Sequence, residues 1–295
     1  MSEERRHALL VNPSSGSGRA AKLLPQVERE LRARNAVFRT VKTRSLGHGI
    51  EEALAAAESG EVPVVMSGDG LIGAIGGALA DSTAPLGVIP GGRGNDFARV
   101  MDIPTGIPEA VSVLLAGEER QIDVGEVNGR RFLCIASTGF DSDANRRAND
   151  TRIVRGNLVY AYAAFRTLAT WRPADFTVTI DGERHEHRGY SVAVANSKAF
   201  GGGMLIAPDA LLDDGLFDVV LTGEESKLSF VRNLPKVFKG THVELDVITV
   251  LRGAEVEISA SRPFEIYADG EHIADLPAKL RLLRRALRVI APAPK

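Results

Sequence analysis

The sequence predicts two domains, a doubly wound parallel α/β domain followed by a β-dominated domain with antiparallel connections. In about the first 120 residues, short apolar runs alternate with segments of helical spacing, which is the order of strands and helices around a parallel sheet. Past Arg120, alternating apolar and polar residues around turn signals replace that order. The chain of 295 residues is long enough for two domains, because single cores stop growing near about 250–300 residues. These observations place the boundary near Ile122.

The composition is that of an ordinary globular protein. Hydrophobic residues make up 44% and charged residues 25%, and the formal net charge of −2 gives no global bias toward nucleic acid. The single cysteine, Cys134, lies in an apolar run, so we expect a buried thiol and no internal disulfide. The sequence shows neither a signal-peptide core nor an uncharged apolar stretch of about 18 residues. We therefore expect no transmembrane segment and a cytoplasmic location.

Four apolar runs are predicted as parallel strands of the first domain. They lie at residues 7–12, 36–44, 62–66 and 86–89. A helix is predicted over 20–35, where leucines and a valine recur at helical spacing, and another over 47–60, which Gly60 closes. Each of the last two strands ends in a glycine-rich turn before a helix start. The segment between them is long enough for a crossover helix, as a parallel pair requires.

The second domain is predicted to consist mainly of antiparallel strands. Residues 121–140 resemble a hairpin, and residues 176–196 alternate around the turn dipeptide Asp181-Gly182. Further strands are expected at 216–222, 246–253, 254–260 and 263–273. Helices are expected over about 143–171 and 227–239. The tail 279–290, rich in Leu and Arg, is interpreted as a final strand or edge returning to the first domain, with contact to anionic lipid as the alternative.

Glycine-rich loops follow the first, third and fourth predicted strands, and they indicate phosphate binding. Glycine lets the backbone approach a ligand closely, and helix N-termini favour anions. The loop over 12–18 lacks the Lys-Ser/Thr ending of a P-loop. Residues 68–73 match the dinucleotide pattern GxGxxG, but they fall in the third βα unit, and no acidic residue ends the next strand. A hydride-transfer enzyme is therefore disfavoured.

Polar residues in these loops have both a functional and a plain interpretation. Asp69 would repel phosphate unless a cation bridges them, which favours Mg²⁺, although an Asp at this position can also cap its own helix. Asn95 or Asp96 is predicted to cap the helix that begins at Phe97, and Arg93 to contact phosphate oxygens as a fork. The alternative for these residues is ordinary turn chemistry.

Six segments in the same order resemble the diacylglycerol kinase catalytic-domain family of bacterial lipid kinases, which is related to sphingosine kinases and more distantly to NAD kinases. They read NPSSG at 12–16, SGDG at 67–70, PGGRGNDFAR at 90–99, STGFD at 137–141, a long signature within 196–216, and DGE at 269–271. The resemblance implies an α/β nucleotide-binding domain of the NAD-kinase/diacylglycerol-kinase type, and a β-sandwich domain for the lipid substrate. Their expected bounds are 1–122 and 123–287, with 288–295 returning to the first domain.

The resemblance also implies the reaction, its cofactors and its residues. The γ-phosphoryl group of ATP would pass to a lipid hydroxyl with Mg²⁺ present, with diacylglycerol as the first choice of substrate. Glu271 matches the family's proton acceptor, and Asp69 would hold nucleotide and metal. Nucleotide contacts are implied for Asn12, Thr43, Ser67, Gly68, Asp69, Gly70, Leu71, Gly92, Arg93, Gly94, Asn95 and Asp96. A second, structural Mg²⁺ would be held by Asp214 and by the backbone carbonyls of Leu211 and Leu216.

The chain departs from the family pattern at Leu71, Gly73, Ala74 and Arg93, where a hydroxyl and a carboxylate are lost and a guanidinium is gained. Arg93 would replace the lost hydroxyl contact if the protein is a kinase. The alternatives are a non-catalytic nucleotide-binding relative, and a kinase of a soluble substrate such as NAD. The expected partner is a lipid substrate at a membrane surface, through peripheral contact at its inner face, and not nucleic acid. The lipid and the oligomeric state, a homodimer included, stay open.

Overall fold

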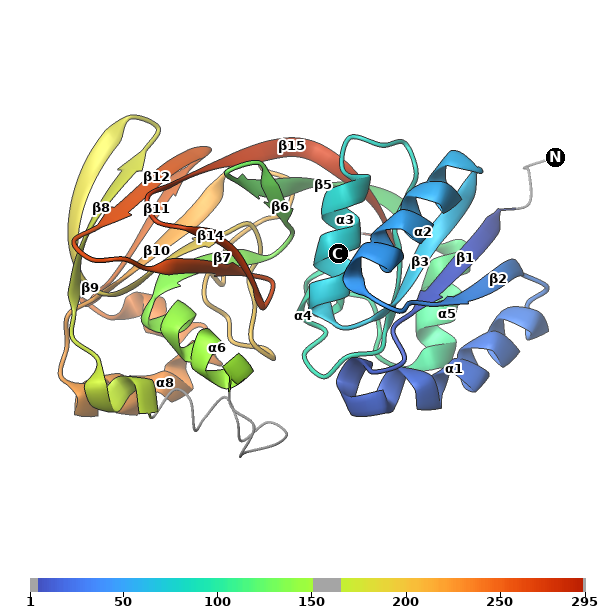
Figure 1. Cartoon of the computed structure of the whole chain (residues 1–295), viewed down its shortest axis with the longest axis horizontal. Coiled ribbons are helices and arrows are strands. Elements are labelled where there is room, and N and C mark those ends of the chain that lie inside the picture. Colours follow the sequence, from blue (N-terminus) through green and yellow to red (C-terminus); the bar gives the residue numbers. More distant parts are fainter. Residues whose placement is uncertain (1–4, 151–165, 294–295) are drawn as a thin grey trace. The chain divides into compact units, whose positions relative to one another are not determined.

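The protein divides into two compact units in a computed structural model that describes residues 5–150 and 166–293 (Figure 1). Met1–Val124 and Leu283–Lys295 form one unit, and Gly125–Leu282 form the other. The chain passes from one unit to the other within two strands, β5 (Glu118–Val127) and β15 (Ala278–Ala291). The predicted fold class, an α/β domain followed by a β-rich domain, is confirmed.

The first unit contains a four-stranded parallel sheet in the order β2-β1-β3-β4. Its strands are β1 (Arg6–Val11), β2 (Val37–Lys42), β3 (Glu61–Ser67) and β4 (Gly87–Pro90). Strand β2 lies on one side of β1, and β3 and β4 lie on the other. The direction of winding therefore reverses between β1 and β3, and the carboxyl ends of strands at such a point are where open α/β sheets bind ligands.

Helices cover both faces of this sheet. They are α1 (Ser15–Ala33), α2 (Leu46–Glu58), α3 (Asp69–Leu79), α4 (Asp96–Val100) and α5 (Ile107–Ala116). Helices α1 and α5 pack on one face, and α2 packs beside α3 (Figure 1). Leu24, Val27 and Leu31 of α1 follow helical spacing and pack in one cluster with Val64 and Met66 of β3. The end of β15 joins this unit, where the N–H of Ile290 donates to the carbonyl oxygen of Leu86 at 2.9 Å.

The second unit is built on antiparallel strands whose order is β14-β13-β7-β9-β8-β12-β15-β5-β6, with β10 pairing β9 and β11. The strands not yet given are β6 (Arg130–Phe132), β7 (Ile135–Gly139), β8 (Ala174–Ile180), β9 (Glu183–Ala195), β10 (Phe217–Gly223), β11 (Ile248–Gly253), β12 (Glu255–Ala260), β13 (Glu265–Ala268) and β14 (Glu271–Asp275). Strands far apart in this order contribute to one core, because Val256, Val219 and Ile266 belong to the same cluster. The predicted hairpin around Asp181-Gly182 is confirmed.

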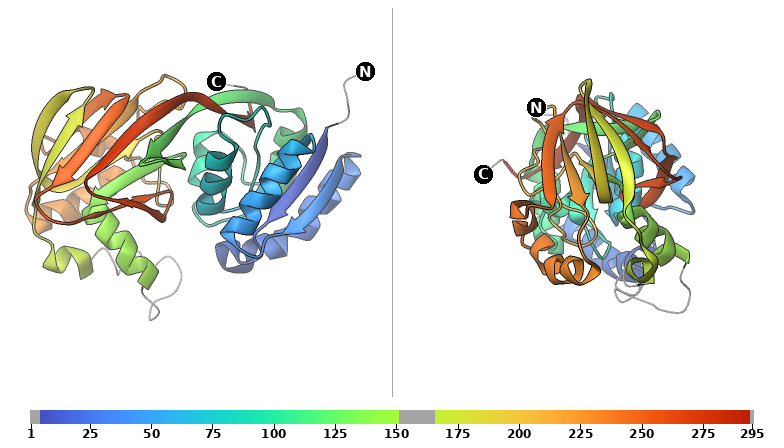
Figure 2. Two further views of the ribbon diagram at one scale, coloured as in Figure 1. Left: turned by 45° about the horizontal axis from the view of Figure 1, so that its top comes forward. Right: turned by 90° about the vertical axis from the view of Figure 1, so that its left-hand side faces the viewer.

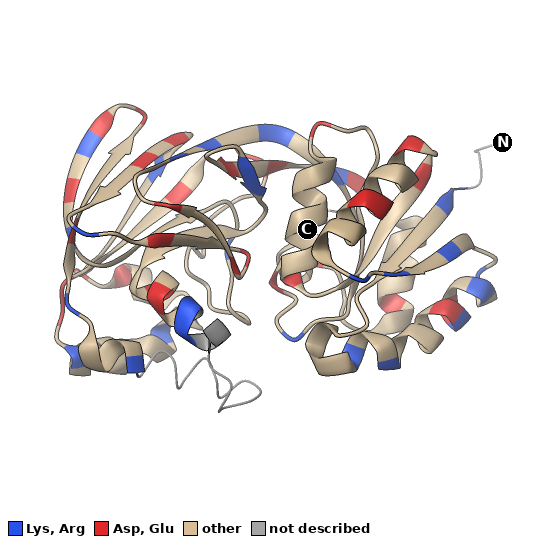
Figure 3. Ribbon diagram, in the orientation of Figure 1, with Lys and Arg blue, Asp and Glu red and all other residues tan. Residues whose placement is uncertain are grey.

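Two helices of this unit lie at the same end of the β-rich layer, as Figure 2 shows. They are α6 (Phe140–Asp150) and α8 (Lys227–Val237), and the short 3-10 helix Thr241–Glu244 follows α8. The helix predicted near 227–239 is confirmed. The helix predicted over about 143–171 is confirmed at its beginning by α6, whereas residues 151–165 lie outside the described residues. Acidic and basic residues are interspersed over both units (Figure 3).

Candidate functional site

The four strands of the first unit deliver four loops to one edge of their sheet. Asn12, Thr43, Gly68 and Gly91 directly follow β1, β2, β3 and β4. Because the strands are parallel, their carboxyl ends share this edge, and the loops after β1 and β3 flank the point where the winding reverses. The nucleotide contacts implied by the sequence are thus brought together within one unit.

Backbone contacts hold three of these loops against one another. A Cβ atom on Gly92 would lie 2.4 Å from the Cα atom of Gly68, and a Cβ atom on Gly16 would lie 2.9 Å from the carbonyl oxygen of Gly91. The N–H of Gly91 also donates to the carbonyl oxygen of Ser67 at 2.9 Å. Only glycine at position 92 allows so close an approach, so backbone lines the cradle where these two loops meet.

Asp69 connects the loop after β3 to the helix after β4. Its Oδ1 atom accepts a hydrogen bond from the N–H of Phe97 at 3.0 Å, in the first turn of α4. The predicted side-chain cap by Asn95 or Asp96 is therefore wrong. Asn95 turns back on its own loop, where its Oδ1 accepts from the N–H of Gly92 at 2.8 Å. Asp96 instead pairs with Arg99 at 2.8 Å.

Asp69 and Asp96 form a pair of neighbouring carboxyl groups beside the loops. Burial raises the pKa of Asp69, the N–H of Phe97 opposes that shift, and the negative charge of Asp96 raises the pKa further. Asp96 is itself buried, with 4% of its surface exposed. A cation beside Asp69 would favour its charged form. Oxygen donors of this type suit Mg²⁺, so the pair fits a nucleotide-associated divalent cation.

Two guanidinium groups lie against the loops. Arg93 is exposed and donates to Oγ of Ser17, which lies in the non-helical first residues of α1. Nη1 of Arg19 donates to the carbonyl oxygen of Gly92 at 3.2 Å. Arg93 was singled out by the sequence, but Arg19 was not. The available signal for Arg19 was a basic residue directly after a glycine-rich loop that opens the first helix.

Three predicted contact residues use their side chains internally. Asn12 Oδ1 accepts from the N–H of Ser14 at 3.1 Å, so its side chain shapes the loop. The Thr43 hydroxyl donates to the carbonyl oxygen of Val11 at 3.2 Å. The side chain of Leu71 is buried, and a Cβ atom on Gly49 would lie 2.9 Å from its Cδ1. Leu71 can therefore meet a ligand only through its backbone.

Glu271, the predicted proton acceptor, lies in the second unit at the start of β14. It follows the turn residues Asp269 and Gly270, which have positive φ angles of 52° and 89°. The carboxylate of Asp269 accepts hydrogen bonds from the N–H groups of Leu133 at 2.8 Å and Cys134 at 2.9 Å. Asp269 thus fixes the turn to the strand connection beside it, and Glu271 is exposed. The sequence indicated the turn but not this anchoring role.

The turn predicted to hold a structural Mg²⁺ also lies in the second unit. Asp214 Oδ1 accepts from the N–H of Leu216 at 3.0 Å, and Oδ2 is paired with the guanidinium of Arg252. Leu211 has 48% of its surface exposed. Because Arg252 already pairs with Asp214, a cation bound by Asp214 would share this carboxylate with Arg252.

Asp218 supplies an observation that favours a cation near this turn. It is 4% exposed, and its Oδ2 atom has no hydrogen-bond partner among the described residues. Burial raises its pKa, Arg252 opposes the shift, and the negative charge of Asp214 raises the pKa further. The oxygen donors fit a hard divalent cation. In the described part of the chain no cluster of three His, Cys, Asp or Glu residues could hold a metal, so the backbone carbonyls would be needed.

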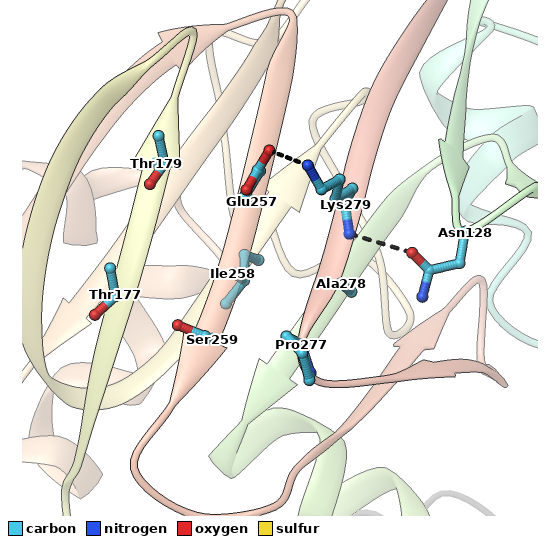
Figure 4. Close-up of a pocket in the computed structure, with 9 residues that line it drawn as sticks. All are labelled: Asn128, Thr177, Thr179, Glu257, Ile258, Ser259, Pro277, Ala278 and Lys279. Atoms are coloured by element: carbon cyan, nitrogen blue, oxygen red, sulfur yellow. Dashed lines mark hydrogen bonds and ion pairs between the residues drawn. The ribbon is translucent and has the colours of Figure 1, made fainter.

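A surface pocket of about 360 Å³ lies elsewhere in the second unit (Figure 4). It contains none of the predicted site residues. Its lining includes hydroxyl and amide side chains, and an ion pair joins Lys279 and Glu257 at 2.5 Å (Figure 4).

Two family models match the chain in succession. The model described as "Diacylglycerol kinase catalytic domain" matches residues 6–127. The model described as "YegS C-terminal NAD kinase beta sandwich-like domain" matches residues 134–291. Together they cover both structural units.

Curated relatives match over nearly their full length. A diacylglycerol kinase from Mycobacterium tuberculosis is 34% identical over 302 aligned residues, which cover 98% of this chain and 97% of the relative. A diacylglycerol kinase from Bacillus subtilis is 29% identical, with 99% and 98% covered. A crystal structure of a putative diacylglycerol kinase from Bacillus anthracis superposes with a TM-score of 0.82 at 24% identity, covering 98% of this chain and 95% of that one, which shows a common fold. Among the helices that the structure describes, none is both long and apolar enough to cross a membrane.

Proposed function

This chain belongs to the diacylglycerol kinase family, and we propose that it transfers the γ-phosphoryl group of ATP to the hydroxyl of a diacylglycerol, with Mg²⁺ as cofactor. The observation that carries the proposal is the backbone cradle formed by the three glycine loops at the carboxyl edge of the parallel sheet. The names of the full-length relatives support diacylglycerol as the substrate.

The glycine loops would position the nucleotide. Phosphoryl transfer asks a protein mainly for positioning and for neutralisation of charge, and backbone N–H groups around Gly68 and Gly92 can supply both. Arg93 would add a guanidinium fork to the phosphate oxygens where relatives carry a hydroxyl. Its contact with Ser17 supports this role, because it holds the guanidinium at the mouth of the first loop.

Asp69 and Asp96 would hold the nucleotide-associated Mg²⁺ through their carboxylates. When bound, this ion neutralises negative charge on the phosphates. Asp69 would also hold the loop after β3 against the start of α4, through the hydrogen bond that it accepts from the N–H of Phe97. Asp214, with the carbonyls of Leu211 and Leu216, would hold a second ion with a structural role.

Glu271 would act as the base. Its carboxylate takes the proton of the lipid hydroxyl while the hydroxyl oxygen forms a bond to the γ-phosphorus. The bond from that phosphorus to the bridging oxygen of ADP breaks, and ADP leaves with the electron pair. An exposed carboxylate on a turn that Asp269 anchors suits this role, because a fixed backbone limits the positions of the base.

One observation favours a second candidate, a nucleotide-binding protein without catalysis. Leu71 is buried where relatives place a hydroxyl, so one side-chain contact to the nucleotide is missing. A kinase of a soluble substrate such as NAD has no such observation in its favour. Peripheral contact with the inner membrane face, a cytoplasmic location and a homodimer stay predictions.

The test follows radioactive phosphate from γ-labelled ATP in the presence of Mg²⁺ and diacylglycerol. We expect a chloroform-soluble labelled product with the wild type and none above background with Glu271→Gln. The matched control is Asp275→Asn, an exposed carboxylate on the same strand, which should keep wild-type activity. Label in a phosphorylated aqueous product would favour a soluble substrate. Thermal stabilisation by ATP without turnover on any lipid would favour the non-catalytic candidate.

A further inference from the structure

Helix α8 presents an exposed face that combines large apolar and basic side chains. None of its residues is fully buried. Leu228 is 81% exposed, and Phe238, directly after the helix, is 52% exposed. Monomeric proteins rarely leave several large apolar side chains of one element in water, and such faces mark contact sites.

Phe230 and Val231 attach α8 to the second unit. The ring of Phe230 stacks on Tyr190 with centroids 4.6 Å apart, and it meets Phe140 edge-on at 5.0 Å. Val231 packs against the same core. These contacts fix the orientation of the helix and leave Leu228 and Phe238 exposed.

The charge of α8 has one sign. The helix carries Lys227, Arg232 and Lys236 and no carboxylate, and Lys239 follows two residues after its end (Figure 3). In the part of the chain that the structure describes, no carboxylate forms an ion pair with Arg232, Lys236 or Lys239. Several cations elsewhere in this unit, by contrast, form ion pairs with carboxylates.

The paired cations make the contrast explicit. Arg184 lies 2.5 Å from Glu186, Lys279 lies 2.5 Å from Glu257, and Arg281 lies 2.7 Å from Glu126. The charges of Arg232, Lys236 and Lys239 are thus available to an external partner, and they lie on or directly after a single helix. That partner should be negatively charged and should also accept apolar side chains.

We propose that α8 is the surface by which this protein docks on an anionic phospholipid bilayer. Leu228 and Phe238 would enter the region between headgroups and acyl chains, and Arg232, Lys236 and Lys239 would bind lipid phosphates. Basic amphipathic helices with Leu and Phe on the apolar side bind membranes in this way. The inference rests on the proposed function in one respect, because a diacylglycerol substrate lies in a bilayer.

A second copy of the chain fits this face less well. A two-fold axis would place Arg232 and Lys236 opposite the same residues of the other copy, since a symmetric interface pairs a patch with itself. Like charges would then meet with no carboxylate on the helix to separate them. A bilayer of anionic lipid supplies the missing negative charge.

The test sediments the full chain with lipid vesicles in the absence of ATP. We expect binding to vesicles of phosphatidylcholine with phosphatidylglycerol, weakened by salt, and little binding to phosphatidylcholine alone. The double variant Arg232→Gln/Lys236→Gln should lower the partition constant roughly 30-fold. Leu228→Ser/Phe238→Ser should lower it roughly 10-fold or more.

Matched controls remove the same features elsewhere. Arg184→Gln/Lys279→Gln removes two exposed cations of the same unit, and Leu54→Ser removes an apolar side chain that is 38% exposed on helix α2. Both should bind vesicles as the wild type does. Equal losses in the control and α8 charge variants would overturn the proposal, because net charge alone would then explain binding.

A kinase assay separates this proposal from the proposed function. The α8 variants should lose activity on long-chain diacylglycerol in vesicles but keep the wild-type rate on a water-soluble short-chain diacylglycerol. Loss on both substrates at an unchanged Tm would mean that α8 serves the active site and not docking. If the wild type is inactive on all lipids, the proposed kinase activity is refuted. Vesicle binding alone then tests whether α8 docks on a bilayer. Unchanged vesicle binding, or an oligomer in the wild type that dissociates in Leu228→Ser/Phe238→Ser, would also overturn docking.

Discussion

The two units form their parts of the candidate site in different ways. In the first unit the backbone itself forms the cradle, and Gly92 lies so close to Gly68 that Gly92 has no room for a Cβ atom. In the second unit Asp269 fixes a turn, and the exposed residue Glu271 follows that turn. In the first unit, a substitution that disturbs nucleotide binding should therefore also disturb the packing of the loops. In the second unit, a substitution of Glu271 should affect catalysis without affecting stability.

The largest expected effect is the loss of catalytic rate on substitution of Glu271 in the second unit. Glu271→Gln should lower kcat by about 10²- to 10⁴-fold, the usual worth of a general base. The free energy of unfolding should change by less than about 0.5 kcal/mol, because the side chain is exposed. Initial rates and chemical denaturation measured on the same preparation check both statements. A large loss of stability would show that Glu271 is part of the packing and would remove the contrast between the units.

Gly92→Ala should damage binding and stability together in the first unit. A Cβ atom 2.4 Å from Gly68 forces the loops apart, so we expect a loss of about 1–3 kcal/mol in unfolding free energy and of ATP-induced stabilisation. Gly47→Ala is the matched control, because its Cβ atom would meet the Ser45 hydroxyl only at 4.0 Å. It should be neutral or slightly stabilising, since alanine favours a helix. Equal Tm values for the two variants would argue against a close-packed cradle.

Asp269→Ala should destabilise the second unit by about 1–3 kcal/mol, because it leaves the N–H groups of Leu133 and Cys134 without this acceptor. Activity should fall as well, since Glu271 loses its anchored turn. Asp275→Ala, at the exposed end of the same hairpin, should change neither quantity much. An Asp269→Ala protein as stable as the wild type would show that strand pairing alone fixes the turn.

The smallest effect concerns the pH dependence contributed by Asp69. Its pKa is raised above 3.8, mainly by burial, so the folded state binds this proton more tightly than the unfolded state. Stability should therefore fall as pH rises from 3.8 through the folded pKa, and level off above it. Asp69→Asn cannot titrate but keeps an oxygen for the N–H of Phe97. Without nucleotide or Mg²⁺, the Tm of the wild type relative to this variant should decrease over that window. A constant difference would contradict the raised pKa.

The sequence predicts most of the elements, because local patterns determine them. Alternating residues around Asp181-Gly182 and the apolar spacing of α1 and α8 depend only on near neighbours. The motifs in the glycine loops likewise predict that Gly68 and Gly92 belong to one site. The fold class follows from the same local evidence, since it depends on the order of strands and helices.

Contacts between distant segments could not be predicted in this way. The bond from Asp69 to the N–H of Phe97 spans 28 positions and depends on how β3 and β4 pair, so the side-chain cap was assigned to Asn95 or Asp96 instead. Asp269 bonds to Leu133, 136 positions away, and the sequence indicated only its turn. The burial of Leu71 against Gly49 is likewise a product of packing between α2 and α3.

The central claim is that the glycine loops of the first unit bind the nucleotide, whereas Glu271 of the second unit acts in catalysis. The most direct test is the shift in Tm that ATP and Mg²⁺ cause in three proteins. We predict that the wild type and Glu271→Gln are stabilised equally, by about 2.7 kcal/mol when ATP is at 100 times its Kd, and that Gly92→Ala is not stabilised. Loss of the shift in Glu271→Gln would mean that the second unit holds the nucleotide. A full shift in Gly92→Ala would mean that the glycine loops do not.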